Sequence, residues 1–267
     1  MIPEPTGIGV FEVEDGSGLW EVGGYFTENP DAAGLILLAS LHKAADFVVS
    51  ELPETDWVAH VRRELVPVEA GRFFVYGSHD ADKVPLDKIP LLIEAAMAFG
   101  TGHHGTTLGC LKALDQLVSD GFVAQNVADI GCGTAVLAMA AARVWSGSDT
   151  LILASDIDQV AVDVAQSNVD ANELTGRIKC LEAAGFADPE LRDAAPYDLV
   201  FANILKGPLI GLAPDMYESL KLGGYVILSG ILNPQADEVI AVYRDLGFNL
   251  VENSQIVDWT TLVLRRV

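Results

Sequence analysis

The sequence contains few cysteines and few basic residues. Its three cysteines, Cys110, Cys132 and Cys180, form no CxxC pair, so neither a zinc site nor a disulfide framework is predicted. This usage is typical of proteins from a reducing cytosol. The 16 lysines and arginines stand against 38 acidic residues, which gives a formal net charge of -22. Such a surface disfavours nucleic-acid phosphates and favours a cationic partner through long-range attraction, although acidity can also serve solubility alone.

Long apolar runs are scarce as well. The longest, such as residues 33–41, are far shorter than the roughly 20 residues that a membrane-spanning helix needs. Residues 1–5 lack the positive charge and the apolar stretch of a secretory signal. We therefore expect a cytoplasmic protein with no membrane partner.

The 267 residues, half of them hydrophobic, suffice for one large α/β domain and a small one. Residues 1–52 predict a small α+β lobe that contains strands at 19–26 and 45–51. Between them we expect a helix with Asn29 as its N-cap and Pro30 in its first position. This lobe either docks a partner or is a structural appendage.

A linker is predicted at residues 53–88, followed by the main domain at residues 89–267. The linker has helical periodicity at 57–65, a strand-like segment at 72–76 and a polar, loop-like segment at 79–88.

Strand-like and helix-like segments alternate through the main domain. Strands are predicted at residues 127–130, 151–155, 178–182, 197–202, 225–229, 248–254 and 259–265. Helices are predicted at residues 134–144, 158–172 with Asp158 as N-cap, 208–220 and 234–246. This alternation indicates a doubly wound, mostly parallel, Rossmann-like sheet of seven strands. The last two strands are too close for a crossover helix, so we expect a C-terminal antiparallel hairpin.

A glycine turn follows the first of these strands, in the run Asp129-Ile130-Gly131-Cys132-Gly133. Glycines let the backbone bend tightly and approach a ligand closely, and ligands bind at the carboxyl ends of the strands in such sheets. Asp156 lies at the end of the next strand, 25 residues after Gly131. An acid at this place can accept hydrogen bonds from both hydroxyls of an adenosine ribose, so the two features together predict a nucleoside site.

The nucleoside could belong to a nicotinamide dinucleotide or to S-adenosylmethionine. The dinucleotide fingerprint places a third small residue where this sequence has Val136. That difference and the predicted C-terminal hairpin favour S-adenosylmethionine, which carries no phosphate. A nicotinamide-dependent oxidoreductase and a non-catalytic binding module remain alternatives from other classes.

Two further segments are more specific. The first, residues 98–107, reads A-F-G-T-G-H-H-G-T-T and leads into a helix; the second, residues 202–209, reads A-N-I-L-K-G-P-L and follows the fourth strand. Asn203 is therefore expected at the carboxyl edge of the sheet, with an amide that both donates and accepts.

With these segments the sequence resembles the PrmA family, the methyltransferases of large-subunit ribosomal protein eleven. The family pattern A-F-G-T-G-T-H-P-T-T is matched except at His103 and Gly105, and Thr134 and Ala135 replace the end of its G-C-G-S-G turn. A-N-I-L-x-G-P-L is matched in full, as is a later L-S-G-I-L at residues 228–232. The resemblance covers nearly the whole chain.

The resemblance implies S-adenosylmethionine as cofactor, no metal, and a basic ribosomal protein as partner. It implies that Thr107, Gly131, Asp156 and Asn203 contact the cofactor, with Asn203 also orienting the amine. Three more residues are implied to lie close by: Phe99, Thr106 and Gly133. It also implies that the N-terminal lobe recognises the substrate, although this lobe is short. A methyltransferase acting on lysines of another protein is the alternative within the same class.

His103 and His104 could suggest a metal site or a general base. No acidic third ligand stands at a fixed spacing, and the family places threonine at His103, so loop or capping roles are expected. No residue can be singled out from sequence as the acceptor of the amine proton.

Overall fold

The computed structural model describes residues 5–12, 19–51, 67–93, 105–147 and 150–267. The chain divides into two compact units, Met1–Thr55 and Asp56–Val267. Within the described ranges, no helix has the length and apolar character that crossing a membrane requires.

The first unit contains a two-stranded sheet and one helix. Strands β1 (Gly7–Glu12) and β2 (Trp20–Tyr25) pair antiparallel, and α1 (Ala32–His42) follows. The helix begins after Asp31, whose carboxylate accepts a hydrogen bond from Ala33 N at 3.1 Å. The cap is therefore Asp31, next to the apolar run, and the expected cap Asn29 is wrong. The strand expected at residues 45–51 is also wrong, because the sheet here pairs only β1 with β2 and leaves that segment no partner strand.

The second unit is built on a seven-stranded sheet in the order β11-β12-β10-β9-β6-β7-β8. Its strands are β6 (Asn126–Ile130), β7 (Leu151–Asp156), β8 (Ile178–Glu182), β9 (Tyr197–Asn203), β10 (Leu220–Leu232), β11 (Phe248–Ile256) and β12 (Trp259–Arg266). Strands β6 to β10 pair in parallel, whereas β12 is antiparallel to both β10 and β11. The predicted sheet and its C-terminal antiparallel hairpin are confirmed.

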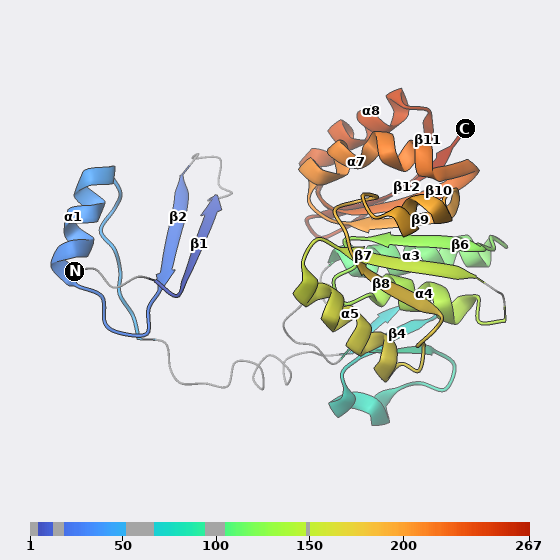
Figure 1. Ribbon diagram of the computed structural model, residues 1–267, viewed down its shortest axis with the longest axis horizontal. Helices are drawn as coiled ribbons and strands as arrows, with labels where there is room; N and C mark the ends of the chain where they lie inside the picture. The colour runs from blue at the N-terminus through green and yellow to red at the C-terminus, as the bar shows by residue number, and fades with distance from the viewer. Residues whose placement is uncertain (1–4, 13–18, 52–66, 94–104, 148–149) are drawn as a thin grey trace. The chain divides into compact units, whose positions relative to one another are not determined.

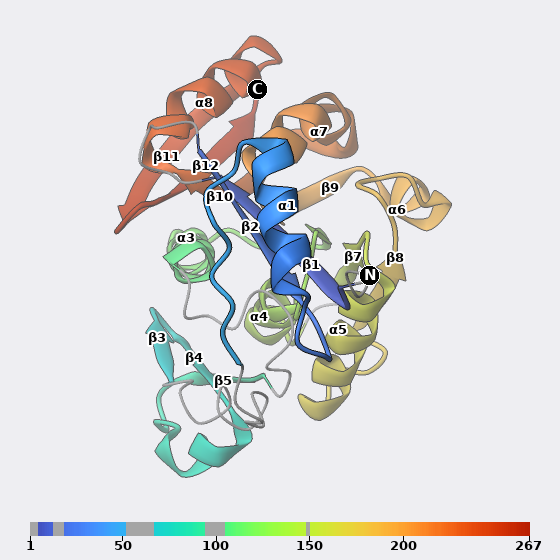
Figure 2. The same ribbon diagram turned by 90° about the vertical axis from the view of Figure 1, so that its left-hand side faces the viewer.

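Helices cover both faces of this sheet (Figures 1 and 2). They are α3 (Gly105–Ser119), α4 (Val136–Val144) and α5 (Gln159–Ala171) on one face, and α6 (Pro189–Ala194), α7 (Lys206–Ser219) and α8 (Ala236–Asp245) on the other. Because both faces are covered, the central strands are mostly apolar, and Val127, Ala128 and Ile130 are all buried. Asp158 caps α5 as predicted, accepting from Val160 N at 2.9 Å. The short α6 was not expected.

Residues 68–92 form a second, three-stranded sheet rather than part of a free linker. It consists of β3 (Val68–Ala70), β4 (Phe73–Tyr76) and β5 (Ile89–Leu92), with a short 3-10 helix, η1 (Ser78–Lys83), between β4 and β5. Phe73 and Leu91 are fully buried in the same core as the first helices of the large sheet. The predicted linker at residues 53–88 therefore differs from the structure, since the apolar residues from Val68 onward belong to this core.

Candidate active site

The glycine turn joins β6 to α4 at the carboxyl edge of the sheet. Gly131 N and Cys132 N both donate to Ser155 O on β7, at 2.8 and 2.9 Å. Gly131 has φ +73°, and a Cβ atom there would overlap the Ile204 side chain. Glycine is thus required at Gly131 both by its conformation and by its close neighbour.

Asp156 lies beside this turn at the end of β7. Its Oδ2 accepts from Gly133 N at 2.9 Å, and its Oδ1 accepts from Asp158 N at 3.2 Å. The carboxylate is half-buried and held by main-chain donors, while each oxygen keeps a free lone pair. The structure therefore brings Asp156 and the glycine turn together, as the sequence predicted.

Asn203 and Thr107 come together from segments far apart in sequence. Asn203 ends β9, the neighbour of β6, and its Nδ2 donates to Thr107 Oγ1 on α3 at 3.3 Å. Asn203 Oδ1 and the adjacent Thr106 Oγ1 are buried and have no hydrogen-bond partner in the described part of the chain. A buried polar atom without a partner costs about 1–3 kcal/mol. Together with Ser155 Oγ at the end of β7, which also has no partner among the described residues, these atoms leave hydrogen-bonding capacity at this edge that a ligand can use.

Asp129 is a buried acid at this edge to which the sequence assigned no role. It lies on β6, is 1% exposed, and its Oδ2 accepts from Ala138 N at 3.0 Å in the first turn of α4. Burial raises the pKa of this carboxyl to about 7, the Ala138 N–H opposes the shift, and the charge of Asp156 adds to it. A charged residue inside an otherwise apolar strand was the available signal.

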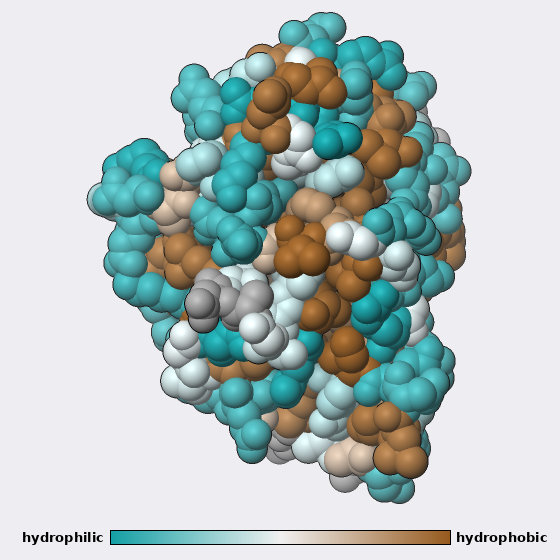
Figure 3. Space-filling model, turned by 90° about the vertical axis from the view of Figure 1, so that its right-hand side faces the viewer, coloured by the Kyte–Doolittle hydropathy of each residue, from teal (hydrophilic) through white to brown (hydrophobic). Residues whose placement is uncertain are grey.

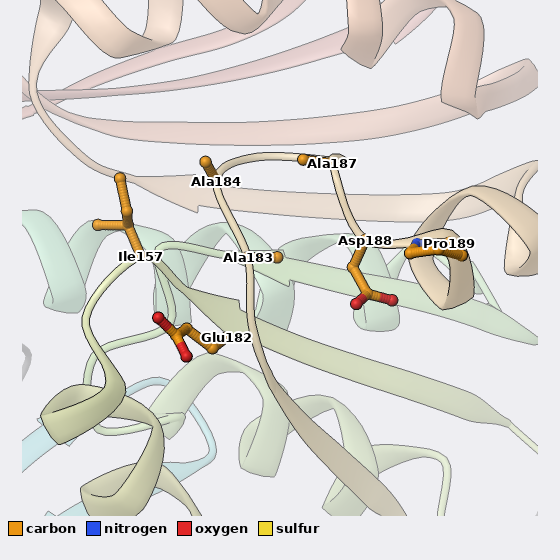
Figure 4. Close-up of a pocket in the computed structure, with 7 residues that line it drawn as sticks. All are labelled: Ile157, Glu182, Ala183, Ala184, Ala187, Asp188 and Pro189. Carbon is orange, nitrogen blue, oxygen red and sulfur yellow. The ribbon is translucent and has the colours of Figure 1, made fainter.

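A pocket of about 390 Å³ is lined by Ile157, the residue that follows Asp156, and by residues after β8 (Figure 4). Ile157 lines one side of it, Glu182 lies at the end of β8, and the loop from Ala183 to α6 forms the other side. Ala183 N donates to Asp156 O at 2.8 Å, which ties this loop to the acid. The apolar side chain of Ile157 suits packing against a flat base, and the carboxylate of Glu182 suits a hydrogen bond from an amino group on that base. No sequence motif marks these residues, although their place at adjacent strand ends could have indicated them.

Phe99, His103 and His104 lie outside the described residues. Within the described ranges, no three histidine, cysteine or acidic side chains gather as metal ligands. Of the residues expected at the site, the structure thus brings together Gly131, Gly133 and Asp156 on one side. It brings together Thr107 and Asn203, next to Thr106, on the other.

A mostly parallel sheet with a reversed C-terminal hairpin is the fold of the class I methyltransferases. The family model "Ribosomal protein L11 methyltransferase (PrmA)" matches residues 9–267. The chain therefore belongs to the PrmA family of ribosomal protein L11 methyltransferases. This result decides against the nicotinamide-dependent oxidoreductase.

Relatives of known name agree with this assignment. The chain is 44% identical to a ribosomal protein L11 methyltransferase of Bradyrhizobium diazoefficiens, over 97% of this chain and 88% of the relative. It is 43% identical to one of Rhodopseudomonas palustris, over 97% and 87% of the two chains. A crystal structure of a ribosomal protein L11 methylase from Lactobacillus delbrueckii subsp. bulgaricus shares the fold, with a TM-score of 0.66 and 24% identity. The match covers 75% of this chain and 99% of that one.

Proposed function

We propose that this protein transfers methyl groups from S-adenosylmethionine to amines of large-subunit ribosomal protein L11, on lysine side chains, on the N-terminal α-amine, or on both. The observation that carries the proposal is the amide of Asn203, whose Nδ2 is engaged by Thr107 while its buried Oδ1 has no partner among the described residues. An oxygen of this kind is suited to accept a hydrogen bond from an incoming amine. The names of the relatives supply the substrate.

The cofactor is held, in this proposal, by Gly131, Asp156, Thr107 and Asn203, with Gly133, Thr106 and Phe99 close by. The Asp156 carboxylate accepts from the ribose hydroxyls through the lone pairs that its main-chain donors leave free. The base occupies the pocket beside Ile157. When bound, S-adenosylmethionine supplies a methyl group already activated by its sulfonium, so the chemistry requires no metal.

The protein's own task is to align the amine and keep it neutral. A free lysine has a pKa of about 10.4, so deprotonation near pH 7 costs roughly 4–5 kcal/mol. A partly desolvated site reduces this cost because burial disfavours the charged form. Asn203 then holds the neutral amine in line with the methyl group, which is where the rate gain from orientation arises.

The acidic surface serves encounter rather than chemistry. A net charge of -22 attracts a basic ribosomal protein, whereas acidic groups at the reacting amine would hold it protonated. We propose residues 1–52 as the lobe that recognises the substrate and residues 89–267, together with the strands β3 and β4 that share their core, as the methyltransferase domain. A substrate of this kind, methylated free or on the ribosome, places the reaction in the cytoplasm.

The test is transfer of label from radioactive S-adenosylmethionine to purified L11. We expect labelled L11 with the wild-type protein and none with Asn203→Ala, and mass spectrometry of L11 from cells with and without the gene should show the same difference. Unlabelled L11 beside another labelled protein in a cell extract would move the proposal to a different substrate.

The role of Asp156 is tested separately by cofactor titration. We expect Asp156→Ala to weaken S-adenosylmethionine binding by roughly tenfold or more, in line with the loss of a hydrogen bond to a charged group. Asp163→Ala is the matched control, since Asp163 is an exposed acid on the next helix. Equal affinities for the two variants would remove Asp156 from the site.

A further inference from the structure

The segment Leu228–Leu232, which carries the sequence L-S-G-I-L, has no part in the proposed function. In the pairing of β10 with β12, Leu228 faces Leu262 and Ile231 faces Thr260. Ser229 and Gly230 therefore stand opposite the single residue Thr261 and form a β-bulge. Bulges are common next to active sites, where they redirect a side chain or the main chain.

Gly230 brings this bulge against the main chain that follows Asn203. Gly230 has φ +82°, and a Cβ atom there would overlap Ile204 O and lie 2.8 Å from Ile204 C. Ile204 N donates to Ser229 O at 3.2 Å, and Ser229 pairs with Asn203 across the parallel strands. The bulge thus contacts the main chain of Ile204, the residue immediately after Asn203, and limits the path that the chain takes there.

The same bulge is anchored toward α3, the helix that carries Thr107. The buried Ser229 hydroxyl bonds to Thr260 O at 3.2 Å and lies 3.0 Å from Thr261 Oγ1. A Cβ atom on Gly109, two residues after Thr107, would overlap Thr261 Oγ1 and lie 3.0 Å from Thr261 Cβ. Helix α3 therefore packs directly on Thr261. Ser229 contacts Thr261 on one side and pairs with Asn203 on the other, so it links the two elements that carry the Asn203–Thr107 hydrogen bond.

We infer that the Ser229–Gly230 bulge is a positioning element for methyl transfer, holding the Asn203 amide at the angle at which it receives the substrate amine. This inference rests on the proposed role of Asn203. In this inference the bulge acts through the main chain of Ile204 and through α3, and needs no contact of its own with cofactor or amine. Gly230 is left-handed and lies against the Ile204 carbonyl, so only glycine fits this position. The pairing of β9 with β10 does not require such a residue, since these strands pair regularly from Tyr225 to Ser229.

The experiment compares Gly230→Ala with Gly223→Ala. Gly223 is also left-handed, φ +80°, and also lies on β10, but a Cβ atom there meets only the flexible end of Arg265 at 3.2 Å. Both variants carry the same conformational strain. We expect Gly230→Ala to lower kcat for L11 by on the order of a hundredfold, because a small misplacement of an aligning group has effects of this size. The dissociation constant for S-adenosylmethionine should rise by less than about tenfold, since only the contacts at Asn203 and Thr107 are disturbed and those at Gly131 and Asp156 are kept. Gly223→Ala should keep the wild-type kcat.

If Gly230→Ala does not fold, Ser229→Ala tests the positioning role of the bulge instead. It removes one hydroxyl bond of the anchor and should lower kcat roughly two- to tenfold. Wild-type kcat in Ser229→Ala, or equal losses in Gly230→Ala and Gly223→Ala, would overturn the inference. The side-chain amide resonance of Asn203 gives a readout without substrate, and it should shift in Gly230→Ala or Ser229→Ala but not in Gly223→Ala. If the wild type does not methylate L11, the proposed function fails, and this resonance alone then decides whether the bulge positions Asn203.

Discussion

Asp129 makes the stability of the protein depend on pH. Burial raises the pKa of its carboxyl from 3.8 to about 7 in the folded protein. Between these values the folded state binds a proton that the unfolded state has lost. The free energy of unfolding therefore falls as pH rises through this window and levels off above about pH 7. The full loss corresponds to about 4 kcal/mol at most.

Asp129→Asn should remove this dependence. The amide oxygen can still accept from Ala138 N, so the first turn of α4 keeps its bond. We expect the variant and the wild type to have similar unfolding free energies near pH 4.5 and the variant to be more stable by a few kcal/mol at pH 8. Urea unfolding without cofactor at both pH values measures this. A constant difference between the two proteins across the range would contradict the assignment.

Ala135 is strained at the start of α4. It has φ +60° and ψ +22°, is fully buried, and stands where the family usually has glycine. The left-handed conformation costs an alanine roughly 1–2 kcal/mol. We therefore expect Ala135→Gly to raise the free energy of unfolding by about 1 kcal/mol.

The control for this variant is Ala161→Gly, in the right-handed first turn of α5. There glycine should lower the free energy of unfolding by about 1 kcal/mol. Thermal or urea unfolding of both variants gives the comparison. Destabilisation by both substitutions would show that the turn does not strain Ala135.

At the scale of elements, the alternation of strands and helices after residue 126 was predictable from sequence. The central strands are mostly apolar because helices cover both faces, and caps such as Asp158 mark helix starts by local chemistry alone. The wrong secondary-structure predictions concern segments whose structure depends on pairing with other strands. Residues 45–51 resemble a strand but have no neighbour to pair with, and β4 looked like part of a linker because its partners β3 and β5 are three and four residues long.

The small β3–β5 sheet should be part of the cooperative core. Phe73 is fully buried there, and Arg72 on the same turn binds the Asp115 carboxylate and, at 3.0 Å, Ser119 Oγ on α3. We expect Phe73→Ala to lower the free energy of unfolding by about 3–5 kcal/mol in a single transition. Val48→Ala, at a 94% exposed position of the first unit, is the control and should have little effect. An unchanged unfolding midpoint for Phe73→Ala would show that the β3–β5 sheet is a linker and not part of the cooperative core.

At the scale of the whole molecule, one half of the candidate site was easier to predict from sequence than the other half. Gly131 directly follows β6 and Asp156 ends β7, so their proximity follows from the βαβ topology. Thr107 and Asn203 lie 96 positions apart, and only the packing of α3 on the sheet brings them into hydrogen-bond distance. The Ser229–Gly230 bulge depends on a register shift between β10 and β12 that no local pattern reveals.

The charge of the molecule leads to a prediction about salt. On the face in Figure 3, hydrophilic residues form most of the rim around a broken band of hydrophobic ones, and the chain as a whole carries a formal charge of -22. Attraction to a basic substrate is screened as the Debye length shrinks from about 10 Å at 0.1 M salt to about 3 Å at 1 M.

We expect kcat/KM for L11 to fall by about tenfold or more between 0.05 and 0.5 M NaCl, because steered association weakens. The value of kcat should change by less than about twofold, because the bound amine is aligned by short-range contacts. A short peptide with a single lysine, which gains little from steering, serves as the control and should show a much flatter dependence. If kcat/KM for L11 were as insensitive to salt as that of the peptide, the acidic surface would serve solubility and not encounter.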